Sequence, residues 1–219
     1  MVTNNLEEQN LTIIKERYQM FADGQAMIGF LGVGKGKGPL QMMLGVRNSY
    51  DKSSSVAIAA GAMVIICSNG MVSGNVTYMR RHTGDVLDHV NQRVECAVKS
   101  LTPTLDKSLR EMRRMEKVQL TENGIAHILG ELFYKEELLR IQQLSVVKNE
   151  ILTSDNFKMV DTQSMNLWNL YNNVTESLKN TNINGLRIQA NVHDYFVAKA
   201  EPKVLNIHGS VLQPEPLFD

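Results

Sequence analysis

The spacing of apolar residues divides the chain into a first part typical of strands and a second part typical of helices. Residues 40–47, LQMMLGVR, alternate apolar and other side chains, which predicts a strand with one buried face and one wet face that carries Arg47. Apolar runs at 26–33 and 56–67 predict two further strands, each covered on both faces. Gly-, Pro- and Ser-rich turns separate the three runs. The pattern therefore predicts an antiparallel meander over residues 26–67.

Helical spacing is found on both sides of this meander. Residues 6–21 are loosely helical, and apolar residues repeat at intervals of three and four from Val86 onward. Thr102-Pro103 predicts the end of one helix and the start of the next, because proline is favoured at the first helical position. Thr121 is a predicted N-cap for a third helix whose apolar stripe extends to Leu144. Ser164 is the predicted cap of a last helix, which ends near residue 180.

Together these elements predict an α+β fold, a three-stranded antiparallel meander followed by several helices. Residues 1–83 form the N-terminal helix and the meander, and residues 84–219 form a helical part packed on the sheet. The last stretch, residues 202–219, holds three of the five prolines and has little periodicity, so we expect a loose C-terminal arm.

Composition excludes several classes of protein. The longest apolar run, residues 56–67, is shorter than the roughly 20 residues of a transmembrane helix, and three Glu precede any long apolar run, so no signal peptide is expected. Two cysteines cannot form a disulfide framework. We expect a cytoplasmic protein that does not bind membranes.

The charge of the chain is zero overall, with 23 basic and 23 acidic side chains, but its distribution is uneven. Residues 24–52 and 80–117 are net positive, whereas residues 118–219 are net negative. Such asymmetry is typical either of a site for a polyanion or of a charge-paired self-assembly surface; the alternative is an ordinary solvated surface. A three-stranded sheet also leaves two edges to cover. We therefore predict a homo-oligomer.

No set of residues in the sequence predicts catalysis. Residues 29–35 match the phosphate-loop pattern G-x-x-x-x-G-K, but Gly36 replaces the required Ser or Thr and Pro39 leads into a strand instead of a helix. The five histidines show no metal-ligand spacing. We expect a non-enzymatic protein with no catalytic residue, no metal and no cofactor.

Basic and aromatic residues are the remaining candidates for function. Arginines at spacings of three and four share one side of a helix, and glycines flank a basic hairpin tip that can approach phosphates. Tyrosines offer stacking surfaces for bases. The predicted nucleic-acid-binding residues are Lys35, Lys37, Arg47, Tyr50, Tyr78, Arg80, Arg81, Arg110, Arg113 and Arg114. In the alternative interpretation, the arginines are solvated or paired with Glu111 and Glu116.

The stretch LGVRNSYDKSSSVAIAAGAMVIICSNGMV resembles the core of a phage- and plasmid-encoded family, domain of unknown function 932. The matching features are the Asn-Ser-Tyr-Asp turn at 48–51, the apolar strand and its end at Cys67, Asn69 and Gly70. The segment LWNLYNNVTESL, residues 167–178, looks like the closing helix of that family. The resemblance implies a mobile-element setting and a bacterial host cell. The organisation is also similar to Rad-52-like single-strand annealing proteins; this likeness concerns the fold and brings no catalytic residues.

Two functions follow as expectations. The first is a phage- or plasmid-encoded protein that binds or anneals single-stranded nucleic acid without a cofactor, as a ring or filament. Its binding is expected to be independent of base sequence and to weaken with salt. The second is a non-enzymatic protein–protein module of a mobile element, either a host-defence antagonist or an assembly factor.

Overall fold

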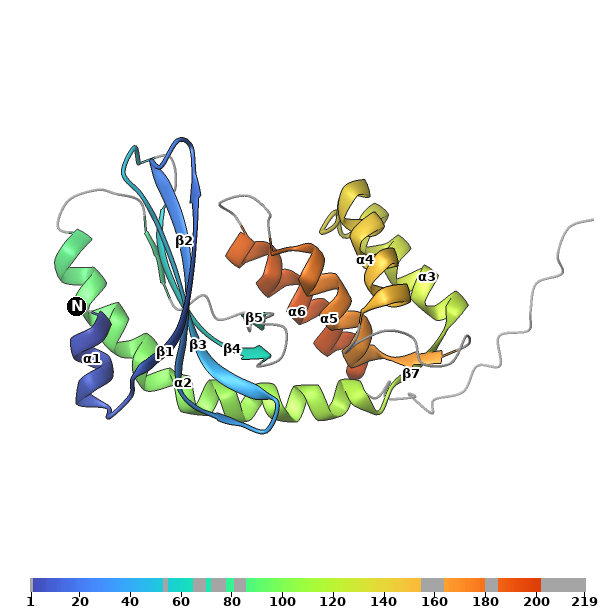
Figure 1. Ribbon diagram of the computed structural model, residues 1–219, viewed down its shortest axis with the longest axis horizontal. Coiled ribbons are helices and arrows are strands. Elements are labelled where there is room, and N and C mark those ends of the chain that lie inside the picture. The colour runs from blue at the N-terminus through green and yellow to red at the C-terminus, as the bar shows by residue number, and fades with distance from the viewer. Residues whose placement is uncertain are drawn as a thin grey trace, which may run out of the picture.

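The computed structural model confirms the α+β class (Figure 1). It describes residues 2–52, 55–64, 70–71, 78–80, 86–154, 164–179 and 185–201. In chain order the elements are α1 (Val2–Glu8), β1 (Ile13–Phe21), β2 (Ala26–Lys37), β3 (Leu40–Ser49), β4 (Val56–Val64), β5 (Gly70–Met71), β6 (Tyr78–Arg80), α2 (Val86–Glu116), β7 (Gln119–Thr121), α3 (Glu122–Gly130), the π-helix η1 (Glu131–Lys135), α4 (Ile141–Thr153), β8 (Ser164–Asn166), α5 (Leu167–Ser177) and α6 (Gly185–Ala200).

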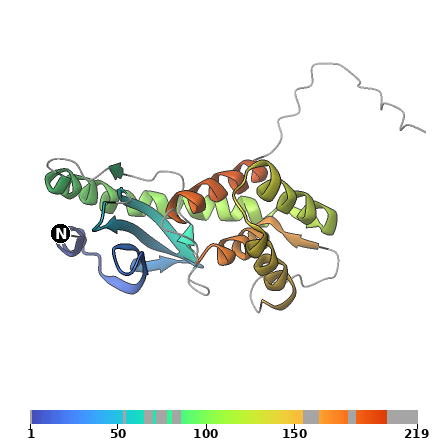
Figure 2. The same cartoon turned by 90° about the horizontal axis from the view of Figure 1, so that it is seen from above.

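The main sheet is antiparallel, with the order β1-β2-β3-β4 and the short strands β5 and β6 paired with β4. In its centre Leu44 of β3 lies opposite Leu31 of β2 and Ala60 of β4. The predicted meander corresponds to β2, β3 and β4. Both views place this sheet toward one end of the molecule and the C-terminal helices toward the other (Figures 1 and 2).

The prediction of a helix over residues 6–21 is wrong for most of that range. α1 ends at Glu8, and residues 13–21 form the edge strand β1, paired with β2. Ile14, Tyr18 and Met20 are apolar but exposed on this strand. Its sequence therefore lacks the pattern of a strand with one buried face, in which the apolar residues are the buried ones. Hydrogen bonding to β2 forms the strand in spite of this weak pattern, because tertiary context outweighs local preference.

The predicted turn over residues 34–39 is largely strand. β2 continues to Lys37, with a register shift between Val33 and Lys37 that is typical of a bulge. Gly34 has a φ of 62°, and a Cβ built there would lie 2.7 Å from Met42 Cε. Glycine is therefore favoured at this bend, which sends the end of β2 toward α2.

Both faces of the sheet are buried, which corrects the prediction of a wet face on β3. On one face Leu31 and Leu44 belong to the main core together with Val94 of α2. On the other face Met43 packs in a second cluster that includes Ala190 of α6. The sequence analysis did not predict α6, so it did not predict that a residue of this helix packs on the second face of the sheet.

Arg47 lies on that second face and is only 4% exposed, so it is not the solvent-facing residue that we predicted. Its Nε–H donates to the Ser55 carbonyl oxygen at 3.1 Å. Burial lowers the pKa of the Arg47 guanidinium. Val46, predicted to be buried, is half-buried beside it.

α2 is one helix of 31 residues that continues through Pro103, which corrects the predicted break. Proline inside a helix typically costs about 3 kcal/mol. Leu101 and Leu105 are buried on either side of Pro103, and this packing holds the helix together. α2 consequently extends beneath the sheet and beneath α5 and α6, joining the two ends of the molecule (Figure 1).

The boundaries of the C-terminal helices were predicted in part. Thr121 is the N-cap of α3, as predicted, since its Oγ1 accepts from the Gly124 N–H at 3.2 Å. The helix expected to reach Leu144 instead ends in η1, and α4 begins at Ile141 after Glu137, whose φ is 54°.

Two predictions near α5 and α6 are wrong. The cap of α5 is Asn166 and not Ser164, because Asn166 Oδ1 accepts from the Asn169 N–H at 2.8 Å. α6 was not predicted at all. The proposed C-terminal arm, residues 202–219, lies outside the described residues.

Glu131, at the start of η1, is expected to make stability depend on pH. Lys199 Nζ and the Tyr195 hydroxyl each lie 2.5 Å from its carboxylate, and these hydrogen bonds lower its pKa from 4.5 to about 2. A lowered folded-state pKa gives stability that is present above pH 4.5 and is lost as the pH falls toward 2. Glu131→Gln is therefore expected to flatten the fall in the urea midpoint between pH 5 and pH 3; an unchanged pH profile would contradict this assignment.

Candidate nucleic-acid interface and an adjoining cavity

An ion pair joins the end of the β2–β3 hairpin to the outside of α2. Lys37 Nζ lies 2.8 Å from Asp106 Oδ1, and both side chains are well exposed. The hydrogen bond and charge of Lys37 lower the pKa of the Asp106 carboxyl, with a smaller effect of Arg110. Asp106 precedes Arg110 by one helical turn, so the hairpin tip lies beside the arginine-bearing part of α2.

The three predicted arginines of α2 are exposed on the side of the helix that faces away from the core. Arg113 and Arg114 follow Arg110 at spacings of three and four and share its side of the helix. Within the described parts of the chain, none of the three forms an ion pair. Their charges are therefore available to a ligand.

In the alternative interpretation the arginines are solvated or paired with Glu111 and Glu116, and the position of the Glu111 side chain contradicts only the pairing with Glu111. Glu111 is 2% exposed, and its Oε2 accepts from His193 Nε2 at 3.1 Å. Burial alone would raise the pKa of Glu111, but the hydrogen bond and charge of His193, helped by Lys107, outweigh burial and lower it. On the other side of the imidazole, Nδ1 lies 3.2 Å from the hydroxyl of the fully buried Tyr171. Glu111 thus belongs to the core.

Sequence reasoning missed two lysines that extend the arginine surface. Lys107 and Lys117 are exposed and lie three residues before Arg110 and three residues after Arg114. The same spacing rule that grouped the arginines could have found them. We call this set the basic surface; it consists of Lys37, Lys107, Arg110, Arg113, Arg114 and Lys117.

The structure does not bring the other predicted residues to the basic surface. Tyr50 is 87% exposed, but it follows β3 at the end opposite the hairpin, about 30 Å away at the usual rise of a strand. Arg47 is buried. The side chains of Lys35, Tyr78 and Arg80, and all of Arg81, lie outside what the structure describes.

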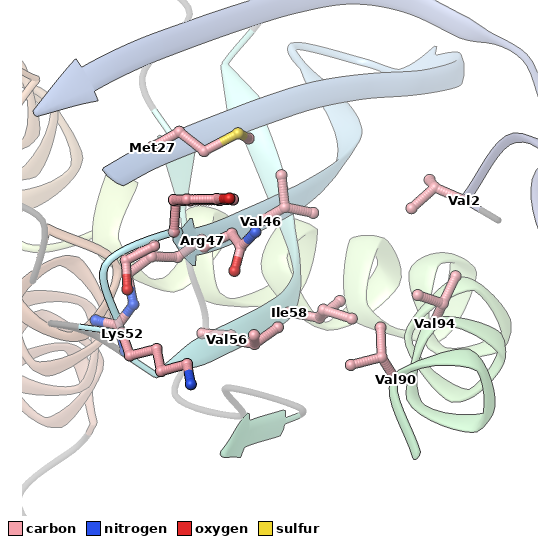
Figure 3. Close-up of a pocket in the computed structure, with 13 residues that line it drawn as sticks. Val2, Met27, Val46, Arg47, Lys52, Val56, Ile58, Val90 and Val94 are labelled. Carbon is pink, nitrogen blue, oxygen red and sulfur yellow. The ribbon is translucent and has the colours of Figure 1, made fainter. Parts of the chain in front are cut away.

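A cavity of about 450 Å³ lies at that other end of the sheet, next to the first turns of α2. Figure 3 shows Val46 and Ile58 of the sheet facing Val90 and Val94 of α2. Further lining residues are Val2, Met27, Arg47, Asn48, Ser49, Tyr50, Lys52, Val56 and Ala57. The walls are mainly aliphatic, and the polar residues come from the end of β3 and the turn after it.

Comparison with protein families identifies the chain. A family model described as "Domain of unknown function (DUF932)" matches residues 9–202. The chain belongs to the DUF932 family. No match was found among curated proteins or among solved structures.

The turn that carries the resemblance to DUF932 proteins, residues 48–51, contributes three residues to the rim of the cavity. In the described part of this DUF932 chain, no group of three or more side chains is arranged to hold a metal ion. A search of the described helices for one that is long and apolar enough to cross a membrane found none. A second cavity, of about 510 Å³, lies between α3 and α4 and is lined by Ile125, Leu129, Phe133, Leu144 and Ile151 among others.

Proposed function

We propose that this DUF932 protein binds single-stranded nucleic acid through the basic surface, and that it anneals strands in the cytoplasm of a bacterial host as the product of a phage or plasmid. The observation that carries the proposal is the contact between Lys37 and Asp106. This contact groups cations of the hairpin and of α2, which are far apart in sequence, on one exposed surface.

The charges on this surface suit a phosphate backbone. Arginine and lysine neutralise phosphates and release counterions, which supplies sequence-independent affinity. The arginines Arg110, Arg113 and Arg114 lie on the last two turns of α2, where cations also favour the helix dipole. That stabilising effect explains one or two of these arginines, but it does not explain Lys37 at the hairpin.

The fold supports the same proposal by analogy. An antiparallel meander packed on a long helix is the organisation by which the sequence resembles Rad-52-like annealing proteins. The exposed edge strand β1, with Ile14, Tyr18 and Met20 on its surface, supports assembly into a homo-oligomer, since uncovered strands pair with other chains.

The test is a binding assay with fluorescently labelled 30-nucleotide single strands and the matching duplex at 50 mM salt, with sedimentation of the protein in parallel. We expect single strands of different base sequence to bind alike, and an assembly larger than 24.6 kDa. If no oligonucleotide binds, the protein–protein module becomes the better account. A monomer at micromolar concentration would contradict the assembly.

Asp106→Asn is expected to strengthen binding. The substitution releases Lys37 from its ion pair and removes the negative charge between Lys37 and Arg110. We expect affinity for the single strand to rise about three- to tenfold at 50 mM salt, an effect on the scale of one additional phosphate contact. Glu95→Gln is the matched control, because it releases Lys99 in a similar exposed pair away from the hairpin. Equal effects of the two variants would argue against a localised site.

A further inference from the structure

We propose that the cavity beside Val90 and Val94 receives an unpaired nucleobase of the bound single strand. This inference rests on the proposed function. It adds a position at which the protein contacts a base, whereas the basic surface contacts phosphates.

The walls of the cavity suit a flat, weakly hydrated group. Its volume of about 450 Å³ lies in the range of sites for small molecules. Aliphatic side chains from β3, β4 and α2 face one another across it (Figure 3). The aliphatic walls offer van der Waals contacts to the faces of a base, and the two cations in the lining, Arg47 and Lys52, come from the end of β3 and the turn after it.

The rim of the cavity carries the two groups that recur in single-strand binding, an aromatic ring and a cation. Tyr50 is 87% exposed and presents a free face on which a neighbouring base can stack. Lys52 is also exposed and lines the same cavity. Its φ of 62° is in the left-handed region, an unfavourable backbone for lysine.

α2 connects the cavity to the basic surface. Val94 lines the cavity, and Arg110 follows it on the same helix by sixteen residues, about 24 Å at 1.5 Å per residue. Single-strand binding domains commonly span about 4–16 nucleotides. The two side chains lie about 160° apart around the helix at 100° per residue, so one strand contacts both places by passing around α2.

The experiment compares two 30-mers, dT30 and a strand in which all thirty nucleotides are abasic. Both have the same phosphates, so the ratio of their dissociation constants reports contacts to bases alone. For the wild-type protein we expect the abasic strand to bind at least tenfold more weakly, since one stacked base contributes about 5- to 150-fold.

Val90→Trp fills the cavity and is expected to reduce this ratio at least threefold. Val146→Trp is the matched control, because it places the same ring on α4, where Val146 is 41% exposed, and it should leave the ratio unchanged. Circular dichroism and the thermal midpoint establish that each variant is folded. Tyr50→Ala, at an exposed position, provides a second variant that should also reduce the ratio.

The outcomes separate this inference from the proposed function. If neither strand binds the wild-type protein, the proposed function fails and this inference fails with it. If both strands bind equally, or if the ratio is the same in Val90→Trp and the wild type, the nucleobase site is contradicted while phosphate binding stands. If a fluorescent fatty acid binds in the cavity and dT30 does not displace it, the cavity is the site of an apolar ligand and the proposal is overturned.

Discussion

Replacing Arg110, Arg113 and Arg114 together by alanine is expected to weaken binding of a 30-nucleotide single strand by more than about 100-fold at 50 mM salt. Each lost phosphate contact removes about 0.7 from the slope of log affinity against log salt, and at low salt three such contacts amount to two to three orders of magnitude. All three side chains are exposed, so the fold should be retained. Fluorescence anisotropy with labelled strands measures the change.

The matched control removes three cations elsewhere, at Lys135, Lys148 and Arg187, which are also exposed. This variant has the same net charge as the arginine variant, but all three substitutions lie off the basic surface. We expect its affinity to fall less than tenfold. Similar losses in both variants would show that total charge, and not this surface, determines binding.

His193→Leu is expected to destabilise the protein by about 3–5 kcal/mol. His193 is 1% exposed and lies between Glu111 and Tyr171. Without the imidazole, the Glu111 carboxylate remains buried, with only Lys107 Nζ at 3.6 Å to compensate it. Removing one partner of a buried pair typically costs this much, because the remaining charge is desolvated without a hydrogen bond. Urea unfolding, followed by circular dichroism, measures the difference.

The double variant Glu111→Gln/His193→Leu separates the charge effect from lost packing. A neutral amide costs less to bury than a carboxylate, so the double variant should be more stable than His193→Leu alone. It also retains a measurable fold if the single variant does not. A loss below about 1 kcal/mol for His193→Leu would contradict the pair as a core element.

The parts of the fold that were predicted correctly are those in which local sequence and tertiary structure agree. β3 was identified from the alternation of Leu44 with its neighbours, and α3 from the Thr121 cap. The helix through Pro103 was not, because local preference at a Thr-Pro pair favours a break, whereas burial of Leu101 and Leu105 on one face keeps α2 continuous.

For the candidate site, too, local features could be predicted from the sequence and contacts between distant segments could not. The spacing of Arg110, Arg113 and Arg114 places them on one helix face from sequence alone. Their proximity to Lys37 was not predictable. It follows from the contact of Lys37 with Asp106, which spans 69 residues and depends on how the hairpin meets α2. The burial of Arg47 was not predictable either, because the face of β3 that carries it also holds a second apolar cluster, which includes Ala190 of α6.

The central claim, that the basic surface contacts phosphates, is tested most directly by a salt titration of single-strand binding for the wild type beside the Arg110→Ala/Arg113→Ala/Arg114→Ala variant. Log affinity is plotted against log salt between 50 and 300 mM for one 30-mer. The account predicts that the slope of the variant is smaller in magnitude by about 2, which corresponds to three lost phosphate contacts at about 0.7 each. Equal slopes for the two proteins would contradict it.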